Sequence, residues 1–362
     1  MSSITIQTIN VKNEIMKALT FTGIRSITYE SIPDPKLISS TDVIIKTDCC
    51  AICGSDLHVY HGREQGIDMH TAMGHEFAGE IIELGKDVKS FKLGDKVVSS
   101  FTTACGDCFY CLKGLSARCI HNQIYGWIEN GHGLHGAQAE FVRVPLADST
   151  LINYETHELL PEEALLAGDI FSTGYFGALM CDIHPGDHIA VIGCGPVGLM
   201  ATFSAHLLNA DAVYAIDQVE ERLAFANLFG GIPMKNDIDL IKQIKDLTQG
   251  RGVDAVIEAV GNESAQQLAF DLVRPGGTIS TIGVHTTDPF VFKPADVYNK
   301  NITYKSGRCP ARSLMNTTLP LISTHKSVLN KLFTHRFALR DGVQGYNIFD
   351  RKLDGCLKVL LK

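Results

Sequence analysis

The chain has 362 residues, which corresponds to two or three domains of about 150 residues each. Hydrophobic residues make up 45% and charged residues 20%, a balance typical of globular domains with large cores, so a disordered chain is excluded. The 32 Lys and Arg against 40 Asp and Glu give a formal net charge of −8, and because no basic cluster is present we expect no nucleic-acid partner.

The N-terminal segment Met1–Glu14 has no charged stretch followed by an apolar one, so we expect no secretory signal and a cytoplasmic protein. The uncharged stretch from Ile189 to Ala210 is long enough to raise a membrane span. Its glycines and Pro196 are instead typical of a strand, a turn and a helix, so we expect no membrane contact. The 11 cysteines are not spaced as in a small disulfide-rich domain, which favours metal ligation.

Residues 1–160 contain short strand-like runs separated by Gly, Asp and Pro, without helical periodicity. The clearest are Val43–Thr47, Ala78–Leu84 and Lys96–Ser100, the last entered through a turn at Gly94 and Asp95. This pattern predicts a barrel-like, mostly antiparallel β domain.

Residues 161–300 alternate between apolar strands and helices, which predicts a doubly wound α/β domain with a parallel sheet and right-handed crossovers. A turn at Pro275–Gly277 is expected before the last strand, and residues 301–362 are expected to return to the first domain. The expected strands are His188–Ile192, Ala212–Asp217, Val253–Val260 and Thr278–Val284, and the expected helices are Val197–Leu208, Glu220–Phe229 and Leu240–Leu247.

Four cysteines are grouped within 15 residues in the pattern C-x2-C-x2-C-x7-C: Cys105, Cys108, Cys111 and Cys119. Four thiolates can close a tetrahedron around zinc and leave no position open for a substrate, so the pattern predicts a structural zinc site. The alternatives are an iron–sulfur cluster, whose typical runs have a shorter last gap, and four unrelated cysteines.

A glycine-rich run follows the first strand of the α/β domain and opens its first helix: Gly193, Cys194, Gly195, Pro196, Val197 and Gly198. Such a turn brings the backbone and the helix N-terminus to a pyrophosphate. Asp217 ends the next strand, 19 residues after Gly198, where a carboxylate binds the ribose hydroxyls of NAD and repels the 2′-phosphate of NADP. The run therefore predicts NAD, with an ordinary strand–helix turn as the alternative.

A second set of metal-ligand side chains is dispersed along the chain: Cys53, His75, Glu76 and Asp169. Catalytic zinc usually has three protein ligands of these kinds and one open position. Spacing alone only suggests such a site, because a single buried Cys or His more often serves packing.

Taken together, these motifs resemble those of the zinc-dependent medium-chain alcohol dehydrogenases over nearly the whole chain. The resemblance implies a GroES-like β-barrel catalytic domain and a Rossmann domain with the active site between them. It rests on Cys53-Gly54-Ser55-Asp56-Leu57-His58, Gly74-His75-Glu76-Phe77-Ala78-Gly79-Glu80, Gly94-Asp95-Lys96-Val97, the four cysteines, and the segment His188–Asp217.

By this resemblance Cys53, His75 and Asp169 are the ligands of a catalytic zinc, and Glu76 is a nearby carboxylate or exchangeable ligand. The best-known members have a Cys where this chain has Asp169. An Asp there is similar to the branch of glutathione-independent formaldehyde dehydrogenases and some bacterial secondary-alcohol dehydrogenases.

The resemblance also implies how a proton leaves the substrate. Zinc lowers the pKa of an alcohol whose hydride goes to NAD, Ser55 accepts the alcohol proton, and the nicotinamide ribose passes it to His58. Further cofactor contacts are expected from four residues that could equally be surface or core positions: Arg222, Val260, Ile282 and Val284.

Three other functions remain open at this stage. A polyol or amino-acid dehydrogenase would use the same zinc and NAD, whereas a non-catalytic redox-sensing or scaffold protein and a zinc-free quinone reductase would have lost ligands that are present here. The resemblance further implies a homodimer or homotetramer joined partly by edge strands of the Rossmann sheets.

Overall fold

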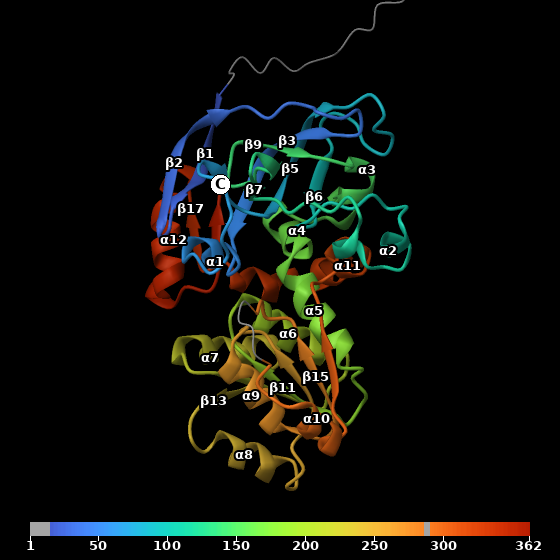
Figure 1. Cartoon of the computed structure of the whole chain (residues 1–362), viewed down its shortest axis with the longest axis vertical. Coiled ribbons are helices and arrows are strands. Elements are labelled where there is room, and N and C mark those ends of the chain that lie inside the picture. Colours follow the sequence, from blue (N-terminus) through green and yellow to red (C-terminus); the bar gives the residue numbers. More distant parts are fainter. Residues whose placement is uncertain (1–14, 286–289) are drawn as a thin grey trace, which may run out of the picture. The chain divides into compact units, whose positions relative to one another are not determined.

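The computed structural model describes residues 15–285 and 290–362, so the segment on which the absence of a signal was predicted lies outside the described residues (Figure 1). The chain divides into two compact units. The first comprises residues 15–169 and 311–362, and the second comprises residues 170–285 and 290–310. The sequence analysis placed these boundaries after residues 160 and 300.

The first unit is built on two mainly antiparallel sheets. The smaller has the order β2-β1-β4, with β1 (Ile15–Gly23), β2 (Ser26–Pro33) and β4 (Thr71–Ala72). The larger has the order β10-β6-β5-β3-β18-β17, with β9 also paired to β3. Its strands are β3 (Val43–Ile52), β5 (Glu76–Leu84), β6 (Lys96–Ser99), β9 (Phe141–Val144), β10 (Leu151–Asn153), β17 (His335–Phe337) and β18 (Val359–Leu361).

A hairpin and several helices, of which α11 is the longest, complete this unit. The hairpin is β7 (Trp127–Glu129) with β8 (His132–Leu134). The helices are α1 (Asp56–Tyr60), α2 (Phe109–Leu112), α3 (Ala147–Thr150), α4 (Pro161–Gly168), α11 (Ala311–Leu329) and α12 (Gly342–Arg351). Because β18 pairs with β3, the C-terminal residues complete the sheet whose strand β3 leads to Cys53.

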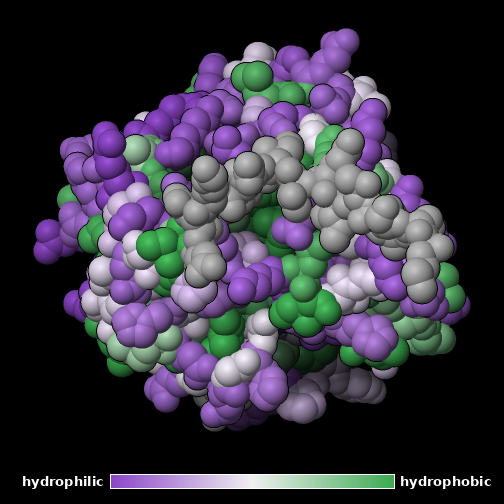
Figure 2. All heavy atoms as spheres, turned by 90° about the horizontal axis from the view of Figure 1, so that it is seen from above, coloured by the Kyte–Doolittle hydropathy of each residue, from purple (hydrophilic) through white to green (hydrophobic). Residues whose placement is uncertain are grey.

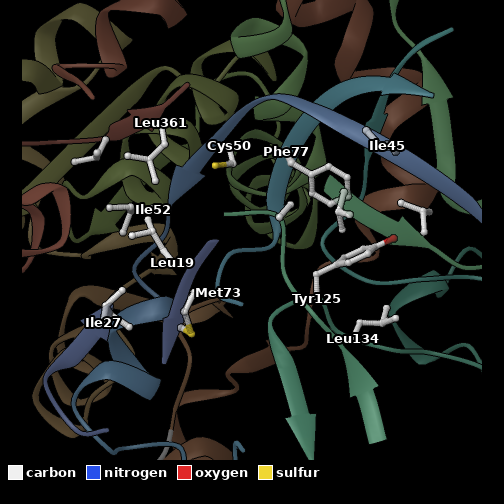
Figure 3. Packing of buried hydrophobic residues seen from close by; sticks show 14 of the residues in the cluster. Leu19, Ile27, Ile45, Cys50, Ile52, Met73, Phe77, Tyr125, Leu134 and Leu361 are labelled. Atoms are coloured by element: carbon white, nitrogen blue, oxygen red, sulfur yellow. The ribbon is translucent and has the colours of Figure 1, made fainter. Parts of the chain in front are cut away.

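The core of the first unit lies between these sheets and draws on residues far apart in the chain. Figure 3 shows Phe77 of β5 packed edge-on against Tyr125, with ring centroids 5.1 Å apart. Leu361 from the C-terminal strand and Leu19 from β1 belong to the same buried cluster. The three strands expected here are confirmed as parts of β3, β5 and β6, so the antiparallel barrel-like class is confirmed.

The second unit has a six-stranded parallel sheet in the order β13-β12-β11-β14-β15-β16. Its strands are β11 (His188–Ile192), β12 (Ala212–Asp217), β13 (Ile232–Lys235), β14 (Val253–Glu258), β15 (Val273–Thr281) and β16 (Thr303–Ser306). Its helices are α5 (Ile170–Met180), α6 (Pro196–Leu207), α7 (Glu220–Ala226), α8 (Leu240–Leu247), α9 (Glu263–Leu272) and α10 (Pro294–Lys300).

Alternate residues of the central strands face opposite sides of this sheet, and both sides are buried. Ile189 and Val191 of β11 pack in one cluster with α5 and α6, whereas Ala190 and Ile192 pack in another with α8 and α9. Burial on both faces explains the continuous apolar strands, and the doubly wound Rossmann arrangement is confirmed.

Several expected boundaries are wrong, because β14 ends at Glu258, β15 ends at Thr281 and α7 ends at Ala226, each before the residue expected. The turn at Pro275–Gly277 lies inside β15 rather than before it, because Val273 already pairs with Val253 of β14. The ladder resumes with Ala255 opposite Thr278, so the proline and two glycines form a bulge.

Within the described parts of the chain, no helix combines the length and apolar character needed to cross a membrane. On the face shown in Figure 2, hydrophilic residues predominate and smaller hydrophobic areas lie between them.

Candidate active site

The fold brings Cys53, His75, Glu76 and Asp169 together, with one ligand atom of each within 4.8 Å of the others. Cys53 follows β3, and His75 and Glu76 stand at the start of β5. These two strands pair directly, with Ala51 opposite Glu76. Asp169 follows the last residue of α4, where the backbone leaves the helical conformation. Antiparallel pairing and one helix end therefore make a single site from three separate segments.

The distances between these groups suit a tetrahedral zinc ion. Asp169 Oδ2 lies 3.4 Å from Cys53 Sγ and 3.2 Å from His75 Nε2. Zinc bonds of about 2.0–2.3 Å at tetrahedral angles separate neighbouring ligand atoms by about 3.3–3.8 Å. A thiolate, an imidazole and a carboxylate are also the ligand types that catalytic zinc uses, so the donor set fits the metal.

The pKa shifts of the ligand side chains also fit a metal site. Burial, together with the charges of Glu76 and Asp169, raises the pKa of the Cys53 thiol above its ordinary value of 9.0. Burial alone would lower the pKa of His75, but the charge of Asp56 and hydrogen bonds to Asp169 and Asp56 raise it well above 6.5. The protons that the Cys53 thiol and the His75 ring retain in this way are those that a divalent cation displaces when it binds.

Glu76 contributes a further buried carboxylate to the site. One of its oxygens accepts a hydrogen bond from the ammonium group of Lys358, and both side chains are fully buried. Its other oxygen, Oε1, has no hydrogen-bond partner among the described residues. An unpaired buried oxygen is costly, and its place in the cluster fits a group that can approach the metal.

Asp56 orients the histidine. Its Oδ1 lies 3.3 Å from Nδ1 of His75, and its Oδ2 accepts the backbone N–H of Cys53 at 2.9 Å. When Nδ1 of the imidazole carries the proton and donates it to Asp56, Nε2 presents its lone pair to the metal position.

Ser55 and His58 lie on the turn that begins α1, where the His58 N–H donates to the Ser55 carbonyl. The Ser55 hydroxyl lies 3.2 Å from His75 Nε2, beside the proposed ligands. His58 is half-buried, and its Nδ1 has no hydrogen-bond partner among the described residues. Burial and the charges of Arg63 and His61 lower the pKa of His58 below 6.5, so its ring is neutral near pH 7.

The four cysteines of residues 105–119, the four-cysteine lobe, also converge, with their sulfur atoms within 4.8 Å of one another. Cys105 and Cys111 have sulfurs 4.0 Å apart, and the backbone N–H groups of Cys105 and His121 donate to Cys119 Sγ. Backbone N–H groups of Cys111 and Ile120 lower the pKa of the Cys108 thiol to about 6, so a thiolate is available at neutral pH. This geometry fits a closed four-thiolate zinc site.

The glycine-rich turn of the second unit joins β11 to α6. Gly193 has a φ of +97°, and a Cβ on Gly198 would lie 1.7 Å from the Gly193 carbonyl oxygen, so no side chain fits there. At Gly195 the nearest atom to such a Cβ, among the described residues other than its chain neighbours, is Arg222 Nη1 at 3.8 Å. Pro196 and Val197 open α6, whose first-turn N–H groups have no acceptor within the helix. The turn is therefore tight on one side and open on the other, as a phosphate site requires.

Two charged side chains stand beside this turn. Asp217 accepts three backbone N–H groups, from Cys194 at 2.7 Å, Gln218 at 2.7 Å and Val219 at 2.9 Å. The carboxylate is thus held against the glycine-rich turn. Nε of Arg222 is buried without a hydrogen-bond partner among the described residues. Both groups fit a polar cofactor in the open side of the turn.

The three apolar residues expected beside the nicotinamide differ in exposure. Val260 and Val284 are 43% and 42% exposed, whereas Ile282 is 8% exposed and packs in the cluster that covers α5. The exposure of the two valines is thus compatible with a contact to the cofactor, whereas Ile282 packs in the core.

The chain matches two family models, "Alcohol dehydrogenase GroES-like domain" over residues 39–154 and "Zinc-binding dehydrogenase" over residues 196–324. It is 39% identical to zinc-type alcohol dehydrogenase B of Aspergillus flavus over 92% of this chain and 79% of that protein. The chain belongs to the zinc-type alcohol dehydrogenase family.

Other relatives agree with this alcohol dehydrogenase family. A medium chain reductase/dehydrogenase of an Acremonium species is 45% identical over 75% of this chain and 94% of that protein. The solved alcohol dehydrogenase of Thermus sp. ATN1 superposes with a TM-score of 0.89 at 36% identity, covering 96% of this chain and 99% of that one. The protein is a zinc-dependent alcohol oxidoreductase.

Sequence reasoning about this alcohol dehydrogenase missed Lys358 and gave no role to Asp56. Asp56 stands inside the quoted motif, three residues after Cys53, which was the available signal. Lys358 comes from the C-terminal strand segment, 282 residues from Glu76, and no local pattern marks it.

Proposed function

We propose that this alcohol dehydrogenase is NAD-dependent and binds two zinc ions per chain. One is held by the four cysteines of the lobe and the other by Cys53, His75 and Asp169. The observation that carries the proposal is the convergence of those three ligands with the Ser55 hydroxyl, which lies 3.2 Å from His75 Nε2. A protein that had become a scaffold would have no need of this hydroxyl beside the metal position.

When bound, zinc lowers the pKa of an alcohol oxygen and NAD takes the hydride from the adjacent carbon. The chain's own residues manage the proton. The Ser55 hydroxyl would accept the proton from the substrate hydroxyl while it releases its own, and His58, kept neutral by its lowered pKa, would be the base that takes up a released proton and passes it to solvent. Glu76 adds negative charge at the site, and Lys358 holds that charge in place.

The preference for NAD rests on Asp217. Its carboxylate is held by three backbone N–H groups beside the glycine-rich turn, and a fixed negative charge there repels a 2′-phosphate. The next residues, Gln218 and Val219, provide no positive charge to bind that phosphate.

The substrate we propose is a simple alcohol or the matching aldehyde or ketone, as in the branch with an aspartate ligand. The ring of Phe101 lies 6.3 Å from the His75 ring, edge to face, and offers an apolar wall beside the ligands. A polyol or an amino acid would need hydrogen-bonding or basic groups at such a wall, so these substrates are less favoured.

A cofactor-reduction assay at 340 nm, run beside a zinc determination, tests the proposal. The assay offers NAD or NADP with formaldehyde, primary, secondary and polyol substrates. We expect two zinc ions per chain and turnover with NAD on simple alcohols. Two zinc ions without turnover on any substrate would overturn the catalytic assignment, and preferred use of NADP would overturn the role of Asp217.

We further propose a cytoplasmic homodimer or homotetramer. β16 is the last strand of the six-stranded sheet, and the edge of such a strand can pair with the same strand of a second copy. Light scattering during size-exclusion chromatography is expected to give two or four chains, and a single chain would contradict the proposal.

A further inference from the structure

A chain of buried hydrogen bonds continues from Asp56 away from the metal position. The side-chain Nε2 of Gln138 donates to Asp56 Oδ2 at 3.1 Å and to the Ala51 carbonyl at 3.2 Å. The Tyr346 hydroxyl donates to Gln138 Oε1 at 2.8 Å. Gln138, Asp56 and Tyr346 are at most 3% exposed, so these bonds do not compete with bulk water.

The pattern allows only one orientation of the Gln138 amide. Two acceptors, the Ala51 carbonyl and the Asp56 carboxylate, face one end of the amide, so that end must be the NH₂ group. The other end is then the carbonyl oxygen, which requires Tyr346 to be the donor. The directions of the hydrogen bonds from Tyr346 through Gln138 to Asp56 are thereby determined.

Packing holds the middle of this chain in place. A Cβ on Gly74, the residue before His75, would lie 2.4 Å from Cγ of Gln138. The Gln138 side chain therefore fills the space beside the backbone that presents the histidine. The Tyr346 ring packs against Tyr60 of α1, with centroids 5.9 Å apart. The same helical turn carries Ser55 and His58.

We propose that Gln138 and Tyr346 are positioning residues for the zinc held by Cys53, His75 and Asp169. They hold the Asp56 carboxylate so that it accepts the Nδ1 proton of His75 and keeps Nε2 directed at the metal. This inference rests on the zinc site of the proposed function and adds two residues to it, neither of which touches the metal or the substrate.

The consequence is a slower loss of zinc from this site than its three ligands alone would give. Groups that orient a metal-binding histidine typically change metal affinity by about 10- to 100-fold. Tyr346 reaches Asp56 only through Gln138, so its effect should be smaller. We expect Tyr346→Phe to speed zinc release by about three- to tenfold, the range of a single net hydrogen bond. Gln138→Met removes all three hydrogen bonds of the amide at similar volume and is expected to have an effect of about tenfold or more.

The chain offers a matched control for the loss of a buried tyrosine hydroxyl. Tyr125 is 1% exposed like Tyr346, lies in the same core cluster, and its hydroxyl accepts from Ser99 at 3.3 Å, outside the chain that leads to His75 (Figure 3). A general loosening of the core would affect zinc release equally in Tyr125→Phe and Tyr346→Phe, whereas a positioning role affects Tyr346→Phe alone.

The experiment follows zinc release from the full-length protein to a chromophoric chelator, with thermal melting of every variant. The zinc of the four-cysteine lobe serves as an internal standard, and His75→Asn identifies the phase that belongs to the active site. We expect Tyr346→Phe and Gln138→Met to accelerate only that phase, and to shift the visible spectrum of Co²⁺ placed in that site. Tyr125→Phe is expected to change neither.

The outcomes separate the two proposals. If wild-type protein releases a single zinc ion, or if His75→Asn retains both, the zinc site of the proposed function fails. If both ions are present and Tyr346→Phe releases them at the rates of Tyr125→Phe with an unchanged Co²⁺ spectrum, the zinc site stands and the positioning role is wrong. Should Gln138→Met fail to fold, Tyr346→Phe alone decides.

Discussion

The two proposed zinc sites are built in opposite ways. The four-cysteine lobe takes all its ligands from residues 105–119, and three of its four cysteines are only half-buried. The active site takes its ligands from three distant segments, and each is less than 9% exposed. A lobe made of one short segment needs little beyond its own thiolates, whereas the dispersed site depends on paired strands and on a surrounding set of hydrogen bonds. Under the proposed function, the first arrangement would stabilise a local structure and the second would bind a substrate.

The largest expected effect is the loss of stability when the zinc site of the four-cysteine lobe is broken. Cys105→Ser removes one thiolate from a site whose binding energy is spent on folding, so we expect destabilisation by several kcal/mol and a lower melting temperature. The fraction that remains folded should keep its turnover, because the active-site ligands are untouched. Melting curves and turnover per folded chain check this. An unchanged melting temperature would mean that the lobe holds no structural metal.

The next effect concerns the charge beside the active site. Lys358→Met leaves the Glu76 carboxylate buried and unpaired, which typically costs about 3–5 kcal/mol. The double variant Glu76→Gln with Lys358→Met should recover most of that loss, since no charge then remains. Urea unfolding of the two variants measures both values. If the free energy of unfolding of Lys358→Met alone lies within about 1 kcal/mol of that of wild type, the buried ion pair is contradicted.

A smaller effect is expected at the nucleotide turn. Asp217→Ala should lower kcat/KM for NAD by about 10- to 100-fold, the range for hydrogen bonds to a charged group, and should improve use of NADP. The ratio of the two kcat/KM values is the measurement, because a general disturbance of the turn affects both cofactors. An unchanged ratio would remove Asp217 from cofactor selection.

The smallest effect is expected at the solvent end of the proton path. The pKa of His58 lies below 6.5, so in wild type its ring accepts protons at pH 6.5 and above. His58→Gln should slow turnover by about tenfold near pH 6.5, less than the roughly 10²-fold of direct proton transfer, and the deficit should shrink as pH or buffer base increases. Identical pH–rate profiles in wild type and His58→Gln would exclude this role.

The same contrast between local and dispersed features explains what could be predicted from the sequence. β11, β12 and α8 have the predicted bounds because continuous apolar runs and helical periodicity are local signals. The four cysteines and the glycine-rich turn are local as well. Convergence of Cys53, His75 and Asp169 could be expected only through a resemblance to a family, because it depends on which strands pair.

Other features that depend on long-range contacts were not predicted. Lys358, Gln138 and Tyr346 act through partners that are distant in the chain, and an isolated Lys, Gln or Tyr carries no pattern. Burial also bears on interpretations that the sequence leaves equal, as for Ile282, which is 8% exposed and packs in a core cluster just after β15. The features that could be predicted from the sequence differ from those that could not in how far apart their residues lie in the chain, rather than in the chemical type of those residues.

The most direct test of the account is the zinc content of Asp169→Ala, measured together with turnover on NAD and an alcohol. Asp169 is a ligand of the dispersed site alone, so the account predicts one zinc ion per chain, retained by the four-cysteine lobe, in a folded protein without turnover. Two zinc ions per chain in a folded Asp169→Ala variant would contradict the ligand set on which the proposed function rests.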